Sequence, residues 1–204
     1  MNTTDRAGPA ARQITAVILA GGRGRRMGGR DKGLVSFAGR PLVEHVLEAV
    51  RPQCGQILIS ANRNLPDYRR YGFPVLEDSV GDYSGPLAGV ATALEVAQTP
   101  FLLTLPCDSP FPPTRLATVL LQRLLETEAD AAVAHDGHRL QPMFALLRRE
   151  LLSDLLAYLG GGGRGAGEWY RKQRLAVADF GHCAAAFGNI NTETDKEELE
   201  RRPG

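Results

Sequence analysis

The sequence predicts an α/β fold in which a mostly parallel sheet carries helices on both faces, with a small antiparallel element late in the chain. Two observations predict this fold. Residues 14–20 form a nearly continuous apolar run ended by glycines, which is typical of a strand buried on both faces of a parallel sheet. Segments with strand and helix character then alternate as far as residue 126, as expected where helices connect parallel strands.

Each further element follows from a local pattern. Residues 42–50, opened by Pro41 at a favoured first-turn position, carry apolar side chains at spacings of three and four, which predicts an amphipathic helix. Residues 131–134 and 143–147 flank an Asp-Gly turn and predict an antiparallel strand pair. Between these segments we expect strands at residues 56–60, 74–76 and 101–105, and helices at 65–71, 87–97 and 113–126.

The last part of the chain continues the alternation. We expect a helix at residues 149–159, a strand at 175–180 and a final helix that Thr194 opens, with Glu197 completing a capping box. The glycine tract at residues 160–165, GGGGRG, has two interpretations. The simpler one is a flexible surface loop, and the functional one is a lid that carries Arg164.

Length and composition favour one globular domain. The chain has 204 residues, of which 43% are hydrophobic and 23% charged, a balance that excludes disordered and fibrous classes. We expect a flexible N-terminal tail at residues 1–12 and a single domain at 13–204. No apolar stretch is long enough to predict a membrane span, and three widely separated cysteines predict neither a disulfide framework nor a metal pair. A cytoplasmic location follows as an expectation.

Positive charge is concentrated in one segment. Residues 23–32 carry five cationic side chains and one carboxylate, whereas the whole chain has a net charge of only +1. Aromatic residues make up 6% of the chain and are absent from this segment, which argues against a nucleic-acid partner. Because six glycines lie at residues 19–33, backbone N–H groups can approach an anion closely, and we expect a small phosphorylated ligand.

Two common phosphate-binding patterns do not fit this segment. The P-loop pattern places Ser or Thr after its lysine, but Gly33 follows Lys32 here. The dinucleotide pattern G-x-G-x-x-G begins at Gly22 and Gly24 and is broken by Met27. The sequence therefore predicts neither a P-loop ATPase nor a simple dinucleotide-dependent dehydrogenase.

Several blocks of the chain resemble a known family. LAGG at residues 19–22 and the following Arg-Met-Gly and lysine resemble nucleotidyltransferases, in which an acceptor phosphate attacks the α-phosphorus of a nucleoside triphosphate. Five blocks together are similar to the molybdenum cofactor guanylyltransferases: RMGGRDKGL at 26–34, EDS at 77–79, GPLAG at 85–89, PCDSP at 106–110 and NINT at 189–192. The resemblance covers about residues 14 to 200.

The resemblance implies a Rossmann-like nucleotidyltransferase domain that joins GMP from GTP to the terminal phosphate of molybdenum-molybdopterin. The products are the guanine dinucleotide cofactor and pyrophosphate. By this resemblance Lys32 neutralises charge on the triphosphate and Arg26 assists it. The nucleotide lies along Leu19, Ala20, Gly21 and Gly22.

Two aspartates complete the implied site. Asp108 follows the apolar strand at 101–105, at the sheet edge where ligands bind, and its carboxylate suits Mg²⁺ that bridges phosphate oxygens. Asp78 is placed near the nucleotide by the resemblance. From local pattern alone, either aspartate could instead be a turn or cap residue. Lys32, Arg26 and Asp108 are therefore the candidate catalytic residues, and Asp108 is the candidate metal ligand.

One position departs from the family pattern. Where the family commonly begins an N-x-N-R stretch with Asn, this chain has Ser60, followed by Asn62 and Arg63. Either Ser60 holds the nucleotide through a water molecule, or Asn62 replaces the missing amide.

The acceptor side and the competing functions stay open at this stage. We expect Arg164 and residues 189–192 on the pterin side, and a molybdoenzyme or its chaperone as a candidate recipient of the product. The alternatives are cytidylyl transfer to the same cofactor, a sugar-phosphate or isoprenoid-precursor nucleotidyltransferase of the same fold, and a carrier that holds the cofactor without catalysis. Nucleotide preference and pyrophosphate release separate these functions.

Overall fold

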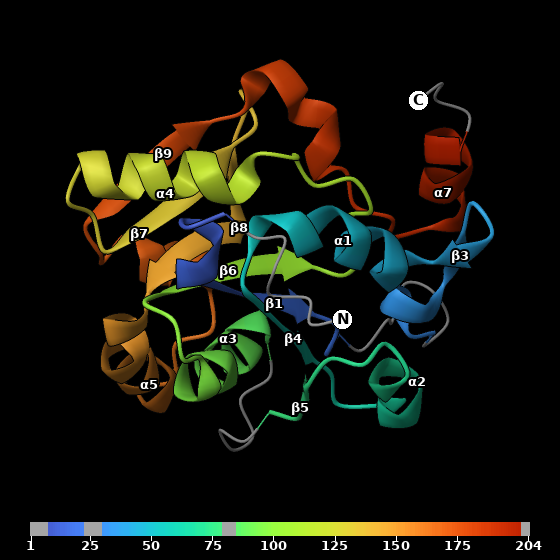
Figure 1. Ribbon diagram of the computed structural model, residues 1–204, viewed down its shortest axis with the longest axis horizontal. Coiled ribbons are helices and arrows are strands. Elements are labelled where there is room, and N and C mark those ends of the chain that lie inside the picture. Colours follow the sequence, from blue (N-terminus) through green and yellow to red (C-terminus); the bar gives the residue numbers. More distant parts are fainter. Residues whose placement is uncertain (1–7, 23–29, 79–84, 201–204) are drawn as a thin grey trace.

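A sheet of seven strands runs through the protein in the order β5-β4-β1-β6-β8-β7-β9 (Figure 1). The structure is a computed structural model and describes residues 8–22, 30–78 and 85–200. The strands are β1 (Ile14–Leu19), β4 (Gln56–Ser60), β5 (Val75–Leu76), β6 (Phe101–Pro106), β7 (Ala131–His135), β8 (Leu140–Arg148) and β9 (Leu175–Asp179).

Strand direction confirms the expected fold class. β5, β4, β1 and β6 are parallel to one another, and β7 is parallel to β9. β8 is antiparallel to both of its neighbours, β6 and β7, and the β7–β8 pair is the expected late antiparallel element. Its register shifts between Val133 and Ala134, and β8 begins at Leu140, three residues before the predicted start.

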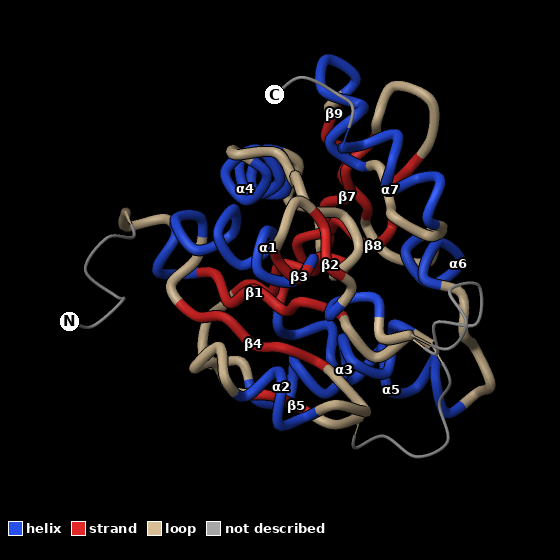
Figure 2. The backbone as a smooth tube through the Cα atoms, turned by 90° about the vertical axis from the view of Figure 1, so that its right-hand side faces the viewer, coloured by secondary structure: helices blue, strands red, loops and turns tan. Residues whose placement is uncertain are grey.

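Helices cover both faces of the sheet (Figures 1 and 2). One face packs against α1 (Leu42–Val50) and α4 (Leu116–Glu126), and the other against α3 (Pro86–Val96) and α5 (Leu152–Gly160). The remaining helices are α2 (Leu65–Arg69), α6 (Ala166–Tyr170), α7 (Glu193–Glu200) and the short 3₁₀ segments η2 (Ala11–Gln13), η4 (Lys32–Leu34), η5 (Arg51–Gln53), η6 (Arg149–Leu151) and η7 (Gly181–Phe187).

The two-sided burial explains the apolar run in β1. Side chains alternate across a strand, so Ala16 and Ile18 pack with the core around α1 and α4, whereas Val17 packs with the core around α3. All three are fully buried. Because both sheet faces lie under helices, both sets of positions are mainly apolar, and the buried hydroxyl of Thr15 is hydrogen-bonded to Gln56 and Thr99. Each large apolar side chain buried in this way contributes about 1.5–3 kcal/mol to folding.

A small hairpin follows η4 and was not predicted. β2 (Ser36–Phe37) and β3 (Arg40–Pro41) are antiparallel and are joined by Ala38 and Gly39, whose φ angles are 46° and 79°. Two successive positive φ angles are the signature of a tight hairpin turn. Pro41 therefore lies in β3 with ψ 142°, and α1 begins at Leu42.

The final helix begins earlier than the sequence indicated. The hydroxyl of Thr192 accepts a hydrogen bond from the Asp195 N–H, and the Asp195 carboxylate accepts from the N–H groups of Asn191 and Thr192. The expected cap of Thr194 and Glu197 was wrong, because Thr192 stands where the chain enters α7 and Asp195 stands three residues further on. Leu199 packs with the small cluster formed by Val35, Phe37, Leu42 and Ile190, which anchors the helix beside the hairpin.

The described residues contain no helix that is both long and apolar enough to cross a membrane.

At the N-terminal side, residues 8–12 lead into β1 through η2. The backbone of Arg12 lies against Gly55, where an added Cβ would meet the Arg12 Cα at 2.9 Å.

Candidate active site

Three central strands end together at one edge of the sheet. Leu19 of β1 is in register with Ser60 of β4 on one side and with Pro106 of β6 on the other. Backbone bonds continue past the strands, from the N–H of Ala20 to the Ser60 carbonyl and from the Cys107 N–H to the Leu19 carbonyl. β4 and β5 lie on one side of β1, and β6, which follows them in the chain, lies on the other side. Open α/β sheets bind ligands at the point where the strand order reverses in this way.

Lys32 and Asp108 form an ion pair at this edge. Lys32 Nζ lies 2.8 Å from Asp108 Oδ2, and the two side chains are 22% and 11% exposed. The same Nζ donates to Asn191 Oδ1 at 2.5 Å. Residues separated by as many as 159 positions therefore converge on one ammonium group. The structure brings together two predicted catalytic residues and adds Asn191, which the sequence had indicated for the pterin side.

The C-terminal segment is fixed to the loop that carries Asp108. The Ile190 N–H donates to the Asp108 carbonyl at 2.8 Å, and Ser109 Oγ donates to Asn189 Oδ1 at 2.5 Å. The blocks PCDSP and NINT are thus one structural unit. Asn191 is fixed in turn by Asp195, and hydrogen bonding from the Asn191 N–H is the main cause that lowers the Asp195 pKa.

Ser60, Asn62 and Asp78 form a second polar cluster beside the first. Asn62 Nδ2 donates to Asp78 Oδ2 at 2.7 Å, and the Asp78 N–H donates to Asn62 Oδ1 at 2.9 Å. Ser60 Oγ donates a longer bond of 3.4 Å to Asp78 Oδ1. The three side chains therefore hold one another, with the Asp78 carboxylate oxygens shared between an amide and a hydroxyl.

Burial distinguishes Ser60 from Asn62. Ser60 is buried and lies against α3, where a Cβ added to Gly89 would meet Ser60 Oγ at 2.3 Å. Asn62 is exposed, and a Cβ added to Gly21 would meet its Nδ2 at 3.1 Å. Gly89 lacks a side chain, and this lets α3 approach Ser60 closely. An amide that faces the glycine-rich segment comes from Asn62 instead.

The glycine-rich segment is described at its two ends. Gly21 and Gly22 follow β1 at the sheet edge, and Arg30 leads into Asp31 and η4. The predicted catalytic residue Arg26 lies outside the described residues. Both ends are bound by Arg63, whose Nη2 donates to the carbonyl of Gly22 at 3.1 Å and to that of Arg30 at 2.8 Å. Sequence reasoning did not identify this contact.

Cys107 adjoins Asp108 but cannot act as a nucleophile in this setting. Its side chain is buried, and burial raises the pKa of the thiol, with the neighbouring Asp108 charge acting in the same direction. A buried neutral thiol is a packing group, since the thiolate is the reactive form.

The described hydrogen bonds of Arg164 lie beside the end of α5, and its expected place on the pterin side stays a prediction. Its Nη1 donates to the carbonyls of Leu159 and Gly163 at 3.0 and 2.6 Å, so the side chain satisfies carbonyls at the C-terminal end of α5. The backbone of the glycine tract nevertheless approaches the GPLAG block, because a Cβ added to Gly85 would lie 3.9 Å from the Arg164 carbonyl oxygen.

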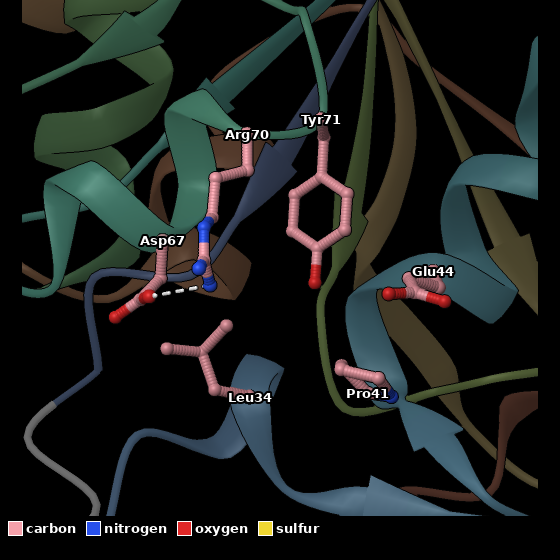
Figure 3. A pocket seen from close by; sticks show the side chains of 6 residues that line it. All are labelled: Leu34, Pro41, Glu44, Asp67, Arg70 and Tyr71. Atoms are coloured by element: carbon pink, nitrogen blue, oxygen red, sulfur yellow. Dashed lines mark hydrogen bonds and ion pairs between the residues drawn. The ribbon is translucent and has the colours of Figure 1, made fainter.

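A hollow of about 440 Å³ lies beside this edge and not within it. Figure 3 shows Tyr71 and Glu44 above Leu34 and Pro41, with Asp67 and Arg70 joined by an ion pair at one side. Neither Lys32 nor Asp108 lines it. The convergence of charged and amide side chains, rather than the size of a hollow, therefore defines the candidate site.

The oxygen donors at Asp108 are of the type that a divalent cation such as Mg²⁺ takes. In the described residues no three His, Cys, Asp or Glu side chains lie close enough together to form a metal centre. Mg²⁺ at phosphate sites takes one or two carboxylates and completes its coordination with phosphate oxygens and water. Asp108 provides such a carboxylate. The side-chain oxygen of Asn191 lies nearby, because both residues accept a hydrogen bond from the Lys32 ammonium group.

Comparison with known proteins gives one consistent family. Residues 16–177 match the MobA-like NTP transferase domain. A molybdenum cofactor guanylyltransferase of Shewanella sediminis (strain HAW-EB3) is 46% identical over 187 residues, which cover 92% of this chain and 95% of the relative.

Solved structures share the fold at lower identity. A molybdopterin-guanine dinucleotide biosynthesis protein A from Archaeoglobus fulgidus has a TM-score of 0.76 and 23% identity, covering 92% of this chain and 96% of its own. A Mycobacterium tuberculosis H37Rv protein solved in complex with manganese has a TM-score of 0.68 and 17% identity, covering 94% of this chain and 100% of its own.

Proposed function

The chain belongs to the molybdenum cofactor guanylyltransferase family and carries a MobA-like NTP transferase domain, and from this premise we propose how its site works. The enzyme transfers GMP from GTP to molybdenum-molybdopterin. The observation that carries the proposal is the convergence of Lys32, Asp108 and Asn191 at the sheet edge, because it joins three of the family-like blocks in one charged site.

The reaction is a displacement at phosphorus. The terminal phosphate of the acceptor attacks the α-phosphorus of GTP, a new P–O bond forms, and the bond to the β-phosphate oxygen breaks. The electron pair of that bond leaves with pyrophosphate. Because the acceptor phosphate is already nucleophilic, the enzyme needs no covalent intermediate and no strong general base.

Lys32 stabilises the charge that this displacement moves. Its ammonium group is held between Asp108 and Asn191, so it is oriented before the substrate arrives. Residues 19–22 offer their backbone to the nucleotide at the ends of β1 and β4, and Arg26 adds a second positive charge in this proposal. Pyrophosphate, the departing group, carries the charge that these cations offset.

Asp108 would hold Mg²⁺ in the proposed site. When bound, the ion would supply positive charge that neutralises the phosphates. The assignment of Asp108 as a metal ligand is supported by the oxygen donors described above and by the manganese complex of the mycobacterial protein of the same fold. Asp108 also retains a second role, since its carboxylate orients the Lys32 ammonium group.

The nucleotide side is proposed around Asp78. Asn62 and Ser60 orient its carboxylate, and Asn62 is the exposed amide that faces Gly21. Ser60 then contributes through Asp78, and Asn62 replaces the asparagine that the family pattern has at position 60. This arrangement is our reason to retain Asp78 and Ser60 in the nucleotide site.

Location and delivery complete the proposal. We expect the reaction in the cytoplasm, where the three unpaired thiols of Cys54, Cys107 and Cys183 would stay reduced. The product passes to a molybdoenzyme or its chaperone. Neither a nucleic acid nor a membrane has a part in it.

An assay with molybdenum-molybdopterin and each of GTP, CTP, ATP and UTP tests this function. Pyrophosphate and the dinucleotide product are measured in the same reaction with Mg²⁺. We expect stoichiometric release of both with GTP. Faster turnover with CTP would instead assign cytidylyl transfer, and binding of the dinucleotide without pyrophosphate release would assign a carrier.

A further inference from the structure

Lys32 and Asp108 form a closed ion pair within the protein itself. The Lys32 ammonium nitrogen lies 2.8 Å from Asp108 Oδ2, and the two side chains are 22% and 11% exposed. Asn191 Oδ1 accepts a second hydrogen bond from the same nitrogen at 2.5 Å. Because water screens a pair of such low exposure only weakly, the charge of the Asp108 carboxylate is largely neutralised by the protein's own cation.

The carboxylates on either side of this pair are bound by other donors. Asp195 accepts from two backbone N–H groups at the start of α7, at 2.8 and 2.9 Å. Asp31, which precedes the lysine in the chain, accepts from the side chains of Tyr68 and Asn64 at 2.6 and 3.0 Å. Asp108 is therefore the carboxylate that the lysine neutralises, and the pair as a whole carries no net charge.

A divalent cation is poorly attracted to a neutral pair of this kind. Its charge is repelled by the ammonium group that lies beside the carboxylate. Bringing uncompensated positive charge into a site that is largely shielded from water also costs solvation free energy. A nucleoside triphosphate changes this balance, because its phosphate oxygens carry the negative charge that both cations need.

The side chain of Lys32 is able to change partners while the backbone stays in place. A lysine has a compact charge on a flexible stem, so its nitrogen can move from a carboxylate oxygen to a phosphate oxygen by rotation of the side chain alone. The backbone at both ends of the pair is hydrogen-bonded. The Val35 N–H donates to the Lys32 carbonyl at 3.1 Å, and the Ile190 N–H donates to the Asp108 carbonyl at 2.8 Å.

We propose that Lys32 is a built-in counter-ion, which keeps a divalent cation off Asp108 until the triphosphate of the nucleotide is bound. The proposal rests on the proposed function, in which Asp108 is the metal ligand. The triphosphate takes over the ammonium group of Lys32, and the Asp108 carboxylate becomes available to the cation. Metal and nucleotide therefore bind together, and each raises the affinity of the protein for the other by the same factor.

The first test measures the Kd of Mn²⁺ for the protein without nucleotide, by electron paramagnetic resonance. The unchanged protein should bind Mn²⁺ weakly. Lys32→Met should lower the Kd by about tenfold or more, because the repelling charge is gone and the carboxylate is free. The matched control is Lys196→Met. The Lys196 side chain is 24% exposed and pairs with Glu193, so the Kd of this variant should equal that of the unchanged protein.

Thermal melts separate metal binding from a loss of stability. Lys32→Met leaves the buried Asp108 carboxylate without its cation, so the melting temperature should fall. Mn²⁺ replaces the lost charge in this variant and should restore part of the melting temperature, whereas the same concentration of Mn²⁺ should not shift the unchanged protein. Lys32→Met combined with Asp108→Asn removes both charges and should abolish the response to Mn²⁺.

Two results would overturn the role of Lys32. One is a Kd for Mn²⁺ in Lys32→Met equal to that of the unchanged protein. The other is a response to Mn²⁺ that persists in the double variant, since the ion would then bind elsewhere. These measurements contain no nucleotide, so they do not depend on the preference for GTP. Normal turnover of Asp108→Asn would reject the metal ligand of the proposed function, and this proposal with it.

Discussion

The protein contains two segments rich in glycine and arginine, and the structure uses them differently. The ends of the first, residues 19–33, lie at the carboxyl edge of the sheet, near Lys32 and Asp108. The second, residues 160–165, wraps around Tyr158 of its own helix, and Arg164 satisfies carbonyls at the end of that helix. We propose that similar composition serves ligand access in the first segment, whereas the second packs closely against its own helix.

The comparison shows that the role of a glycine depends on which atoms lie beside it in the fold. A Cβ added to Gly22 would meet no atom of the described residues within 4 Å, and the same holds for Gly162 in the second segment. A Cβ added to Gly163 would lie 2.3 Å from the Tyr158 ring. Gly163 leaves room for the Tyr158 ring, and we propose that Gly22 gives the nucleotide access to the backbone.

The largest expected difference is between Lys32, in the first segment, and Lys172, which lies beside the second. Lys32→Met removes the cation that we place on the triphosphate, and turnover should fall by about 10³. Lys172→Met is the matched control, because Lys172 lies over the Tyr158 ring at 4.8 Å beside the second segment. Its turnover, measured as pyrophosphate release, should be nearly normal. Equal losses in both variants would contradict the distinction.

Asp108→Asn should have the next largest effect. The variant keeps the shape of the side chain but loses the charge proposed to bind Mg²⁺, so turnover at saturating Mg²⁺ should fall by about 10² to 10³. The ion pair with Lys32 is also weakened, and we expect a loss of about 1 kcal/mol in the ligand-free melt. Near-normal turnover would remove Asp108 from the mechanism and leave it a loop residue.

A pair of alanine substitutions tests the two glycines directly. Gly22→Ala should raise the Kd for GTP by about tenfold, because a methyl group obstructs the approach of the nucleotide to the backbone, while the ligand-free melting temperature stays unchanged. Gly163→Ala should leave the Kd unchanged and destabilise the protein by about 1–3 kcal/mol, since the Tyr158 ring must move.

Calorimetry and thermal melts of the same preparations give both readouts. The assignment of the two segments would be reversed if Gly163→Ala weakened GTP binding and Gly22→Ala lowered the melting temperature.

The smallest expected effect is a pH dependence at the end of the chain. The N–H groups of Asn191 and Thr192 hold the Asp195 pKa below its unfolded value of about 3.9. The carboxylate therefore stabilises the fold above that pH, and the contribution is lost as the pH falls through the lower folded value. Asp195→Asn should flatten the part of the stability curve that lies below about pH 4. If Asp195→Asn left the stability curve at acid pH unchanged, the Asp195 carboxylate would not contribute to stability.

Much of the sheet could be predicted from the sequence, because its strands are buried on both faces. β4 was predicted with its observed bounds, and β1 to within one residue. The β2–β3 hairpin could not be predicted. It is two residues long on each side, and its turn places Ala38 in a conformation with φ 46° that alanine rarely adopts. Tertiary contacts in the small cluster with Ile190 stabilise it instead.

The site was predictable only in part, because several of its contacts join residues that lie far apart in the sequence. Lys32 and Asp108 belong to sequence blocks that suggest phosphate chemistry, and the structure places their side chains together. Arg63 and Asp31 act through a network between α2 and the glycine-rich segment, and no local pattern encodes that contact. Asn191 was expected on the acceptor side, and only the fold of the C-terminal segment reveals its bond to Lys32.

A structure of the protein with Mg²⁺ and a non-hydrolysable GTP analogue tests the central claim most directly. We expect the triphosphate against the backbone of residues 20–22, with Lys32 Nζ within hydrogen-bond distance of a phosphate oxygen and the ion on Asp108. A triphosphate bound in the hollow of Figure 3, or along residues 160–165, would contradict the account.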